Sequence, residues 1–243
     1  MIEISKKRFF NGLNGNQLKI IAMISMLLDH IGVVFFPDVM IWRYMGRIAF
    51  PIYAYMIAEG CKYTRNRKRY LGMISVMALI FQIVYFVFMD GSIYQGILVN
   101  FSLSICAIYA IDSFIKNKNT LNRILMVIAI GTILLIYVGL PIILKDYGFA
   151  IDYNIWGLLL PILVYFVPGK VLRALAIAIF LVIMTLVSGK VWQWWSLLTI
   201  PLFLLYNGER GSKKLKYLFY VFYPLHLVIL YGIAILTIII NHQ

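Results

Sequence analysis

Long apolar runs alternate with short polar connections along the whole chain. A membrane-spanning helix needs about 20 mostly apolar residues to cross a hydrocarbon core roughly 30 Å thick. By this rule the pattern predicts nine spans, at residues 17–36, 44–63, 71–89, 99–115, 124–144, 151–167, 171–187, 192–206 and 217–240. Because every connection is short, we expect one all-α domain over residues 1–243, a polytopic transmembrane bundle of about nine helices.

The basic residues fall on alternate connections. With the N-terminus in the cytoplasm, all of the 22 Lys and Arg residues lie on the inner side except Arg43, Arg47, Lys145 and Lys190. Inner loops of membrane proteins are enriched in Lys and Arg. The pattern therefore predicts a multi-pass protein of the plasma membrane with a cytoplasmic N-terminus and with residues 241–243 outside.

Composition supports a membrane protein. The chain is 63% hydrophobic and only 13% charged, with a mean hydropathy of +0.91, whereas about a quarter of the residues of a soluble domain are charged. The net charge of +13 is best explained by contact with anionic membrane lipids, and we expect no nucleic-acid partner. Cys61 and Cys106 lie in apolar runs without a neighbouring metal-ligand pattern, so no metal is expected.

The first two apolar runs carry five ionisable residues, Asp29, His30, Arg43, Arg47 and Glu59. A charge inside hydrocarbon costs several kcal/mol unless it is paired or faces a water-filled cavity, so such residues are functional candidates. The remaining helices are then expected to wall a cavity around this first hairpin.

Lys19 and His30 share one face of the first helix. They are 11 residues apart, which corresponds to about 20° around the helix and about 16 Å along it. Phosphates held at Lys19 could thus deliver a thioester to His30. Asp29 points about 100° away from His30, and we expect it to meet Arg43 or Arg47. Two alternatives to a functional role remain open. The pair of Asp29 with an arginine could only join the two helices, and His30 could be an ordinary core histidine.

The second run contains a proline just after its arginine pair. Pro51 has no N–H for the carbonyl of Arg47, which predicts a kink beside that arginine and a site for an anion or oxyanion. Glu59 lies nearer the cytoplasmic side and is expected to pair with Lys19 or Lys62. It is either catalytic or a partner in a salt bridge between helices.

A basic segment follows this helix. Its four cations, together with Lys19 and Lys62, favour a site for a diphosphate or nucleotide phosphate, because Arg matches phosphate oxygens. A plain topology determinant would look the same. The four residues are Arg65, Arg67, Lys68 and Arg69.

The last run places a second imidazole, His226, two residues after Pro224. Tyr220 and Tyr223 lie nearby and add phenolic donors, so we assign both to the acceptor site. Asn100 could line the acceptor side together with residues of the outer rim. Those rim residues are Asp146, Tyr147 and Asp152, of which the two acids could equally be solvated loop residues.

Several of these blocks resemble the TraX family over nearly the whole chain. They are Leu18 to Ala22, Leu28 to Gly32, Arg43 with Gly46 to Pro51, Glu59-Gly60, Thr64 to Asn66, and Phe222 to Pro224 with His226 and Leu227. The family takes its name from a plasmid protein that acetylates the N-terminus of pilin. It is distantly similar to the acyltransferase-3 superfamily, in which an arginine precedes a catalytic histidine. Lys19 stands in the place of that arginine before His30, and Tyr223 and His226 match a further pattern of the superfamily.

This resemblance implies a membrane acetyltransferase that takes its acyl group from acetyl-CoA on the cytoplasmic side. The acceptor would be an amine, such as a peptide or pilin N-terminus, or a hydroxyl of a glycan. The donor phosphates would be held by Lys19 and the basic segment, including Lys62. We assign His30, Asp29, Arg47, Glu59 and His226 to the reaction and Arg43 and Asn100 to the acceptor site.

A proton-coupled transporter or flippase is the alternative, because buried charges and proline-broken helices suit it. The absence of an inverted repeat in the sequence argues against a transporter. A structural scaffold has little reason to bury so many ionisable groups.

Overall fold

The computed structural model describes residues 12–89 and 91–241, and this part of the chain is helical, without strands. The all-α prediction is thereby confirmed. The helical segments, in order, are α1 (Gly15–Phe35), α2 (Ile41–Gly46), α3 (Ala49–Tyr63), α4 (Arg67–Phe88), α5 (Ile97–Lys116), α6 (Thr120–Leu134), a π-helical turn (Leu135–Gly139), α7 (Leu140–Ile143), a 3₁₀ turn (Lys145–Tyr147), α8 (Asn154–Phe166), α9 (Lys170–Ser188), a 3₁₀ segment (Val191–Leu198), α10 (Thr199–Leu205), a 3₁₀ turn (Lys213–Leu215) and α11 (Lys216–Asn241).

Five helical stretches among the described residues are long and apolar enough to cross a membrane: α1, α4, α5, Thr120–Ile143 and α9. Three further apolar stretches among the described residues are shorter, Asn154–Phe166, Val191–Leu205 and Val221–Thr237, and the predicted count of nine spans is not confirmed. The predicted span 44–63 is interrupted between α2 and α3, and the predicted span 192–206 begins as a 3₁₀ segment before α10.

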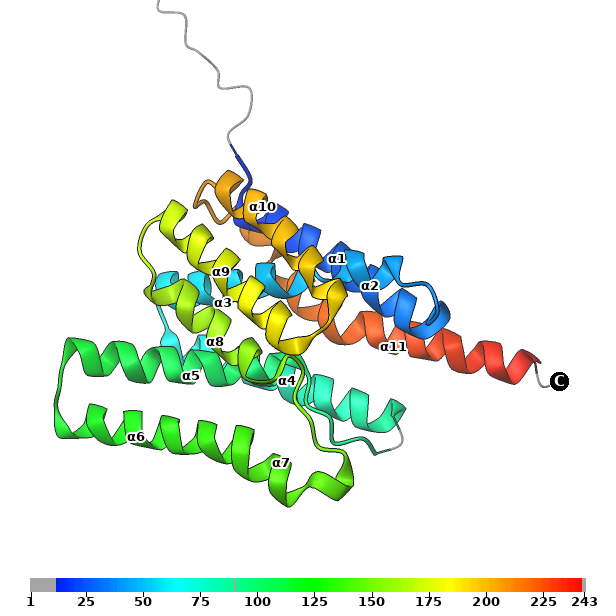
Figure 1. Ribbon diagram of the computed structural model, residues 1–243, viewed down its shortest axis with the longest axis horizontal. Coiled ribbons are helices and arrows are strands. Elements are labelled where there is room, and N and C mark those ends of the chain that lie inside the picture. The colour runs from blue at the N-terminus through cyan, green and yellow to red at the C-terminus, as the bar shows by residue number, and fades with distance from the viewer. Residues whose placement is uncertain (1–11, 90, 242–243) are drawn as a thin grey trace, which may run out of the picture.

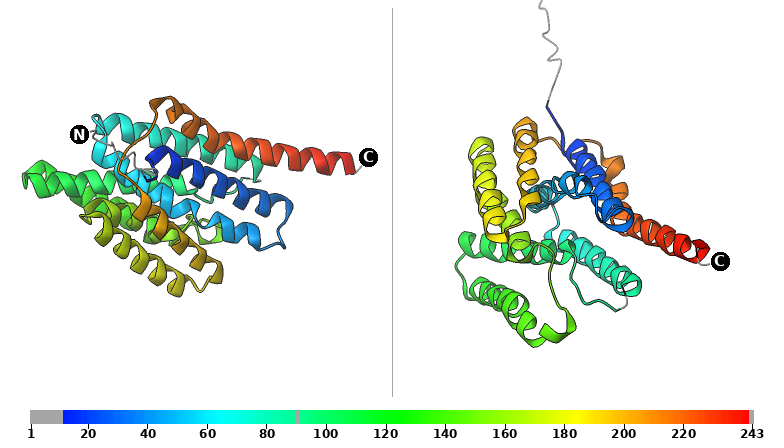
Figure 2. Two further views of the ribbon diagram at one scale, coloured as in Figure 1. Left: turned by 90° about the horizontal axis from the view of Figure 1, so that it is seen from above. Right: turned by 45° about the vertical axis from the view of Figure 1, so that its right-hand side comes forward.

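The helices α5 and α6 lie side by side roughly along the longest axis of the molecule, whereas α9 and α10 run obliquely to it (Figure 1). The helix α3 packs against α1, α5 and α8, and α11 packs against α1 and α4. The far end of α11 extends beyond the other helices (Figure 2). On the opposite side α6 covers α5, and none of residues 120–134 is buried.

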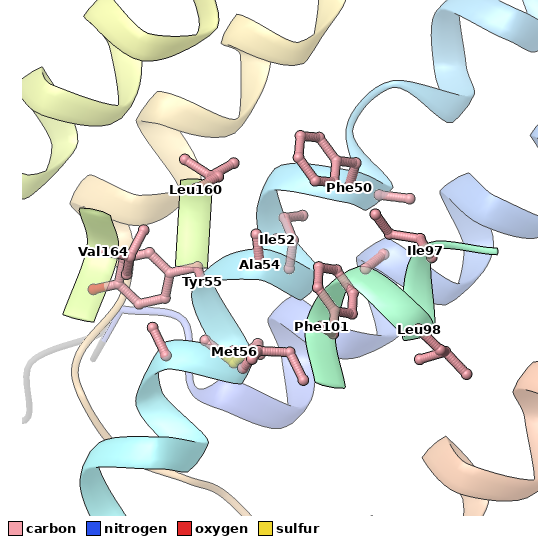
Figure 3. Close-up of a cluster of buried hydrophobic side chains, with 14 of the residues drawn as sticks. Phe50, Ile52, Ala54, Tyr55, Met56, Ile97, Leu98, Phe101, Leu160 and Val164 are labelled. Carbon is pink, nitrogen blue, oxygen red and sulfur yellow. The ribbon is translucent and has the colours of Figure 1, made fainter. Parts of the chain in front are cut away.

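The densest apolar packing surrounds α3 (Figure 3). Burying such side chains contributes roughly 25 cal/mol per Å² of apolar surface in water, although in a bilayer helices associate mainly through close packing. The cluster holds α3 in the centre of the bundle, where its polar residues are kept away from lipid. It includes the residues labelled in Figure 3: Phe50, Ile52, Ala54, Tyr55, Met56, Ile97, Leu98, Phe101, Leu160 and Val164.

Asparagines begin three of the long helices. The side chain of Asn14 accepts from the backbone N–H of Gln17 at 3.0 Å, while the Gln17 side chain accepts from the Asn14 N–H at 2.8 Å. Asn66 caps α4 by accepting from the N–H of Arg69 at 2.9 Å, and Asn119 caps α6 in the same way. These caps satisfy N–H groups that a helix leaves without partners.

The first hairpin is unusually close because glycine faces its partner helix. A Cβ on Gly46 would overlap the side chain of Asp29, and a Cβ on Gly32 would overlap Trp42. Arg47 and Ile48 separate α2 from α3. The break predicted from Pro51 is therefore confirmed, whereas Pro224 lies inside α11 without ending it.

Two pairs of backbone segments fix the ends of the bundle. Leu13 donates to the carbonyl of Leu205 and accepts from the N–H of Asn207, each at 2.8 Å. At the other end, Gln95 donates to the carbonyl of Ala150 at 2.8 Å and accepts from the N–H of Asp152 at 2.9 Å. Loops that are distant in sequence are thus held beside the helices that carry the candidate residues.

Candidate functional site

Two cavities lie inside the bundle and share part of their walls. The larger, about 760 Å³, is lined by basic side chains and is named the basic chamber. The smaller, about 330 Å³, contains Asp29, His30 and Arg47 and is named the polar chamber. Three aromatic residues line both cavities: Tyr53, Phe101 and Tyr223. Both volumes are of the size that holds small ligands in proteins.

Four cations from separate segments line the basic chamber: Lys19, Arg65, Arg69 and Arg210. The ammonium of Lys19 lies 5.2 Å from the centre of the Phe219 ring. The Asn66 cap places Arg69 in the first turn of α4, where the helix dipole also favours an anion. The chamber can therefore bind a polyanionic ligand.

The other cations predicted to hold the donor lie elsewhere. Arg67 forms an ion pair with Asp112 of α5, and its guanidinium lies 4.9 Å from the ring centre of Tyr109. Because Arg67 and Arg69 are about 200° apart around a helix, they face different neighbours. Lys62 and Lys68 are exposed and do not line the chamber, so the structure does not bring these three predicted cations together with Lys19, Arg65 and Arg69.

Arg210 was not among the predicted site residues. The backbone N–H of Gly15 donates to the carbonyl of Glu209 at 2.7 Å, and the Asn16 amide donates to the carbonyl of Ser212 at 2.7 Å. These contacts hold the loop around Arg210 against the start of α1, close to Lys19. In the sequence, the only feature that pointed to Arg210 was its position as a basic residue in a connection that contains glycine.

Glu59 has a different partner from the one expected. Its carboxylate lies 3.3 Å from the guanidinium of Arg173 and accepts from the hydroxyl of Tyr206 at 3.3 Å. Arg173 also donates to the hydroxyl of Tyr55 at 3.1 Å and is 8% exposed. The predicted pairing with Lys19 or Lys62 is therefore wrong, because a buried carboxylate is compensated best by a cation that is equally buried.

Asp29 forms the ion pairs that the sequence predicts. Its carboxylate lies 3.1 Å from Arg43 and 2.6 Å from Arg47. Arg47 also donates to the hydroxyl of Tyr153 at 3.1 Å and lies 3.4 Å from the amide oxygen of Gln193. These bonds fix one guanidinium in the wall of the polar chamber and leave little freedom for it to turn.

The first and last helices bring two imidazoles together. The ring centres of His30 and His226 are 4.9 Å apart, at 73° to one another. Each Nδ1 lies beside a carbonyl of its own helix, that of Met26 at 2.8 Å and that of Phe222 at 2.9 Å. Because a carbonyl only accepts, each Nδ1 carries the proton and each Nε2 keeps its lone pair in the neutral ring. His30 lines the polar chamber, whereas His226 packs behind it.

Asn100 lies outside the polar chamber, whereas Asp152 lines it. Asn100 is fully buried outside the chamber, where its amide donates to the backbone carbonyl of Asp152 and accepts from the hydroxyl of Tyr137. It therefore braces a loop and does not line the acceptor side. Of the two alternatives for Asp152, a residue of the acceptor side and a solvated loop acid, the first agrees with its place in the wall of the polar chamber.

The Asp152 carboxylate accepts a hydrogen bond from Tyr94 at 3.1 Å. Burial, and then the nearby Asp152 charge, raise the pKa of Tyr94 above its ordinary value, so the phenol stays protonated and donates. Sequence reasoning missed this pair because the two residues lie in different loops. Tyr223 lines both chambers, and the side chain of Tyr220 lies outside the described part of the structure.

No three His, Cys, Asp or Glu side chains are arranged for a metal ion in the part of the chain that the structure covers. The polar chamber holds instead a base-competent imidazole, a fixed guanidinium and two carboxylates. Such a set is able to move a proton and to stabilise a developing negative charge.

The chain is 26% identical to the probable fimbrial assembly protein FimC, serogroup H1, of Dichelobacter nodosus, with 88% of this chain and 93% of that protein aligned. It is 32% identical to the uncharacterized protein RP591 of Rickettsia prowazekii (strain Madrid E), over 41% of this chain and 40% of that protein. No solved structure matches the chain. The sequence profile of the family described as TraX protein matches residues 14–234, from before α1 into α11, and the chain therefore belongs to the TraX family.

Proposed function

We propose that this membrane protein is an acetyltransferase that moves an acetyl group from acetyl-CoA to an amine or hydroxyl acceptor. The observation that carries the proposal is the wall of Tyr53, Phe101 and Tyr223 shared by a cation-lined cavity and a cavity that contains His30. A donor anchored in the first cavity could present its thioester to a base in the second.

The basic chamber suits the nucleotide end of CoA. Its four cations match the negative charge of phosphate groups, and arginine provides paired donors. Lys19 and His30 are separated by about 16 Å along α1, a distance that an extended pantetheine arm can bridge. In this arrangement the basic end of the bundle faces the cytoplasm and the protein lies in the plasma membrane.

In the polar chamber, His30 acts as the general base. Its Nε2 takes a proton from the acceptor, whose nitrogen or oxygen attacks the thioester carbonyl carbon. The positive charge of Arg47 stabilises the resulting oxyanion, and the protonated imidazole then gives its proton to the departing thiolate of CoA. Asp29 fixes Arg47 for this task through the 2.6 Å ion pair.

The name of the Dichelobacter relative, a probable fimbrial assembly protein, favours a fimbrial or pilin-type acceptor. A peptide N-terminus is therefore the first acceptor to test, and a glycan hydroxyl is the second. Mass spectrometry of membrane peptides and glycans from cells with and without the protein should detect an added acetyl group on one of them.

The direct experiment uses the purified full chain with labelled acetyl-CoA. We expect CoA to raise the apparent melting temperature, because a ligand that binds only the folded state stabilises it, and we expect labelled acetyl transfer that His30→Ala abolishes. A protein that CoA does not stabilise, or transfer that persists in folded His30→Ala, contradicts the proposal.

One observation favours a proton-coupled transporter instead: the helix break at Arg47 and Ile48 lies beside paired buried charges. CoA separates the two functions, because a transporter of this kind has no reason to bind it. Absence of stabilisation by CoA together with proton-driven uptake into vesicles would favour transport.

A further inference from the structure

The polar chamber contains two acids in different electrostatic situations. Asp29 is held by two guanidinium groups, at 3.1 and 2.6 Å. Asp152 lines the same chamber, but no Lys, Arg or His of the described residues forms an ion pair with it. Its carboxylate receives a neutral hydrogen bond, from Tyr94. One acid is therefore neutralised by the protein, while the other lacks a cationic partner.

The position of Asp152 is built into the fold. Its backbone N–H donates to the carbonyl of Gln95 at 2.9 Å, and its backbone carbonyl accepts from the amide of Asn100. Asn100 is held in turn by the hydroxyl of Tyr137, from the π-helical turn. Removing a carboxylate from bulk water costs free energy unless a partner compensates it. These contacts hold, in the wall of the chamber, a carboxylate that forms no ion pair with the described residues.

A cation that enters the chamber would compensate this acid. A protonated primary amine fits best, because it carries one positive charge and three donors on a small group. Arg43 and Arg47 do not compete with it directly, since both are paired with Asp29. A hydroxyl could offer one neutral hydrogen bond only.

We propose that Asp152 determines which nucleophile the polar chamber accepts, by binding the protonated amine of the acceptor beside His30 in preference to a hydroxyl. The binding step is independent of any reaction. The catalytic consequence rests on the acetyl transfer proposed above.

The acceptor ammonium loses two protons during the proposed transfer. The bound ammonium loses its first proton to water in the chamber and becomes the neutral amine. His30 Nε2 takes the second proton as the nitrogen attacks the thioester carbon, the carbon–sulfur bond breaks, and the imidazolium passes that proton to the thiolate. An ammonium and acetyl-CoA thus give an amide, CoA as a thiol and one released proton.

The binding test compares octylamine with octanol, two probes of equal chain length that differ in their head group. We expect octylamine to raise the apparent melting temperature of the full-length protein more than octanol does at the same concentration. Asp152→Asn should remove this difference. Asp146→Asn, which removes an exposed acid from the nearby turn, should keep it.

Equal stabilisation by the two probes in the wild type overturns the proposal, and so does an amine preference that survives in Asp152→Asn. Asp152→Ser replaces the Asn variant if that variant does not fold, and the wild-type comparison decides without any variant. Failure of CoA to stabilise the protein counts against acetyl transfer. The difference between octylamine and octanol still tests amine binding at Asp152 independently.

A kinetic test follows with acetyl-CoA as donor. Asp152→Asn should raise the KM for octylamine by about tenfold or more, the effect of losing a hydrogen bond to a charged group, while the KM for acetyl-CoA stays unchanged. A variant that loses only kcat, with an unchanged KM for the amine, contradicts a role in binding.

Discussion

His30 and His226 stand edge to face with their ring centres 4.9 Å apart, although they come from α1 and α11. Only His30 lines the polar chamber, and His226 is 4% exposed and stacks on Phe222 at 4.9 Å. The Nε2 of His226 has no hydrogen-bond partner among the described residues. The pair therefore divides into an imidazole that can reach a ligand in the chamber and an imidazole that packs behind it.

This division predicts unequal effects of substitution. His30→Ala should lower acetyl transfer by about a hundredfold to ten-thousandfold, the usual contribution of a general base, without weakening CoA binding. His226→Ala should lower transfer less, because it disturbs the packing behind His30. Rates and CoA-dependent melting shifts of both variants are the measurements. Equal losses would contradict this division of roles.

The basic chamber predicts a selective loss of donor binding. Alanine at Arg65, Arg69 or Arg210 should weaken CoA binding by about tenfold each, as expected for hydrogen bonds to a charged ligand, and added salt should weaken it further. Arg123→Ala is the matched control, because Arg123 is an exposed cation outside the chamber. Isothermal titration with CoA measures the effect, and equal losses in the control would remove the chamber as the donor site.

The Glu59–Arg173 pair predicts a loss of stability. Arg173→Met leaves a carboxylate that is 11% exposed without its cation, and breaking a buried pair in this way costs about 3–5 kcal/mol. Adding Glu59→Gln should recover most of the loss, because the uncompensated charge disappears. Apparent melting temperatures of the single and double variants test this. A single variant as stable as the wild type would show that the pair is not needed.

The close contact of the first hairpin predicts an effect of one added methyl group. Gly46→Ala would push Asp29 away from its arginines, and overpacking of this kind costs about 1–3 kcal/mol. Gly72→Ala in α4 is the control, because a Cβ there meets no atom within 4 Å and alanine favours a helix. Melting temperature and transfer rate should fall in the first variant only, and a Gly46→Ala protein with full activity would contradict the close fit.

Features governed by local sequence were predicted well. Apolar periodicity identified the helical bundle, Pro51 identified the break at Arg47, and the short connection after α1 brought Asp29 to its arginines. These relations involve residues in one helix or in adjacent helices, where spacing along the chain largely fixes geometry.

Relations between distant segments were not predictable in this way. Glu59 forms its ion pair with a cation of α9, and Asp152 lines the polar chamber because its backbone is hydrogen-bonded to Gln95. Arg67 lies outside the expected donor site because it forms an ion pair with Asp112 of α5. Each outcome depends on which helices are neighbours in space, and the order of apolar runs does not specify that.

The packing of α11 against α1 has a consequence for biosynthesis. A ribosome delivers α1 to the bilayer long before it has translated α11. A nascent chain therefore contains His30 without the His226 ring that packs against it. We expect such a chain to be inactive until α11 has been inserted. The protein would then react with cytoplasmic thioesters only after its assembly is complete.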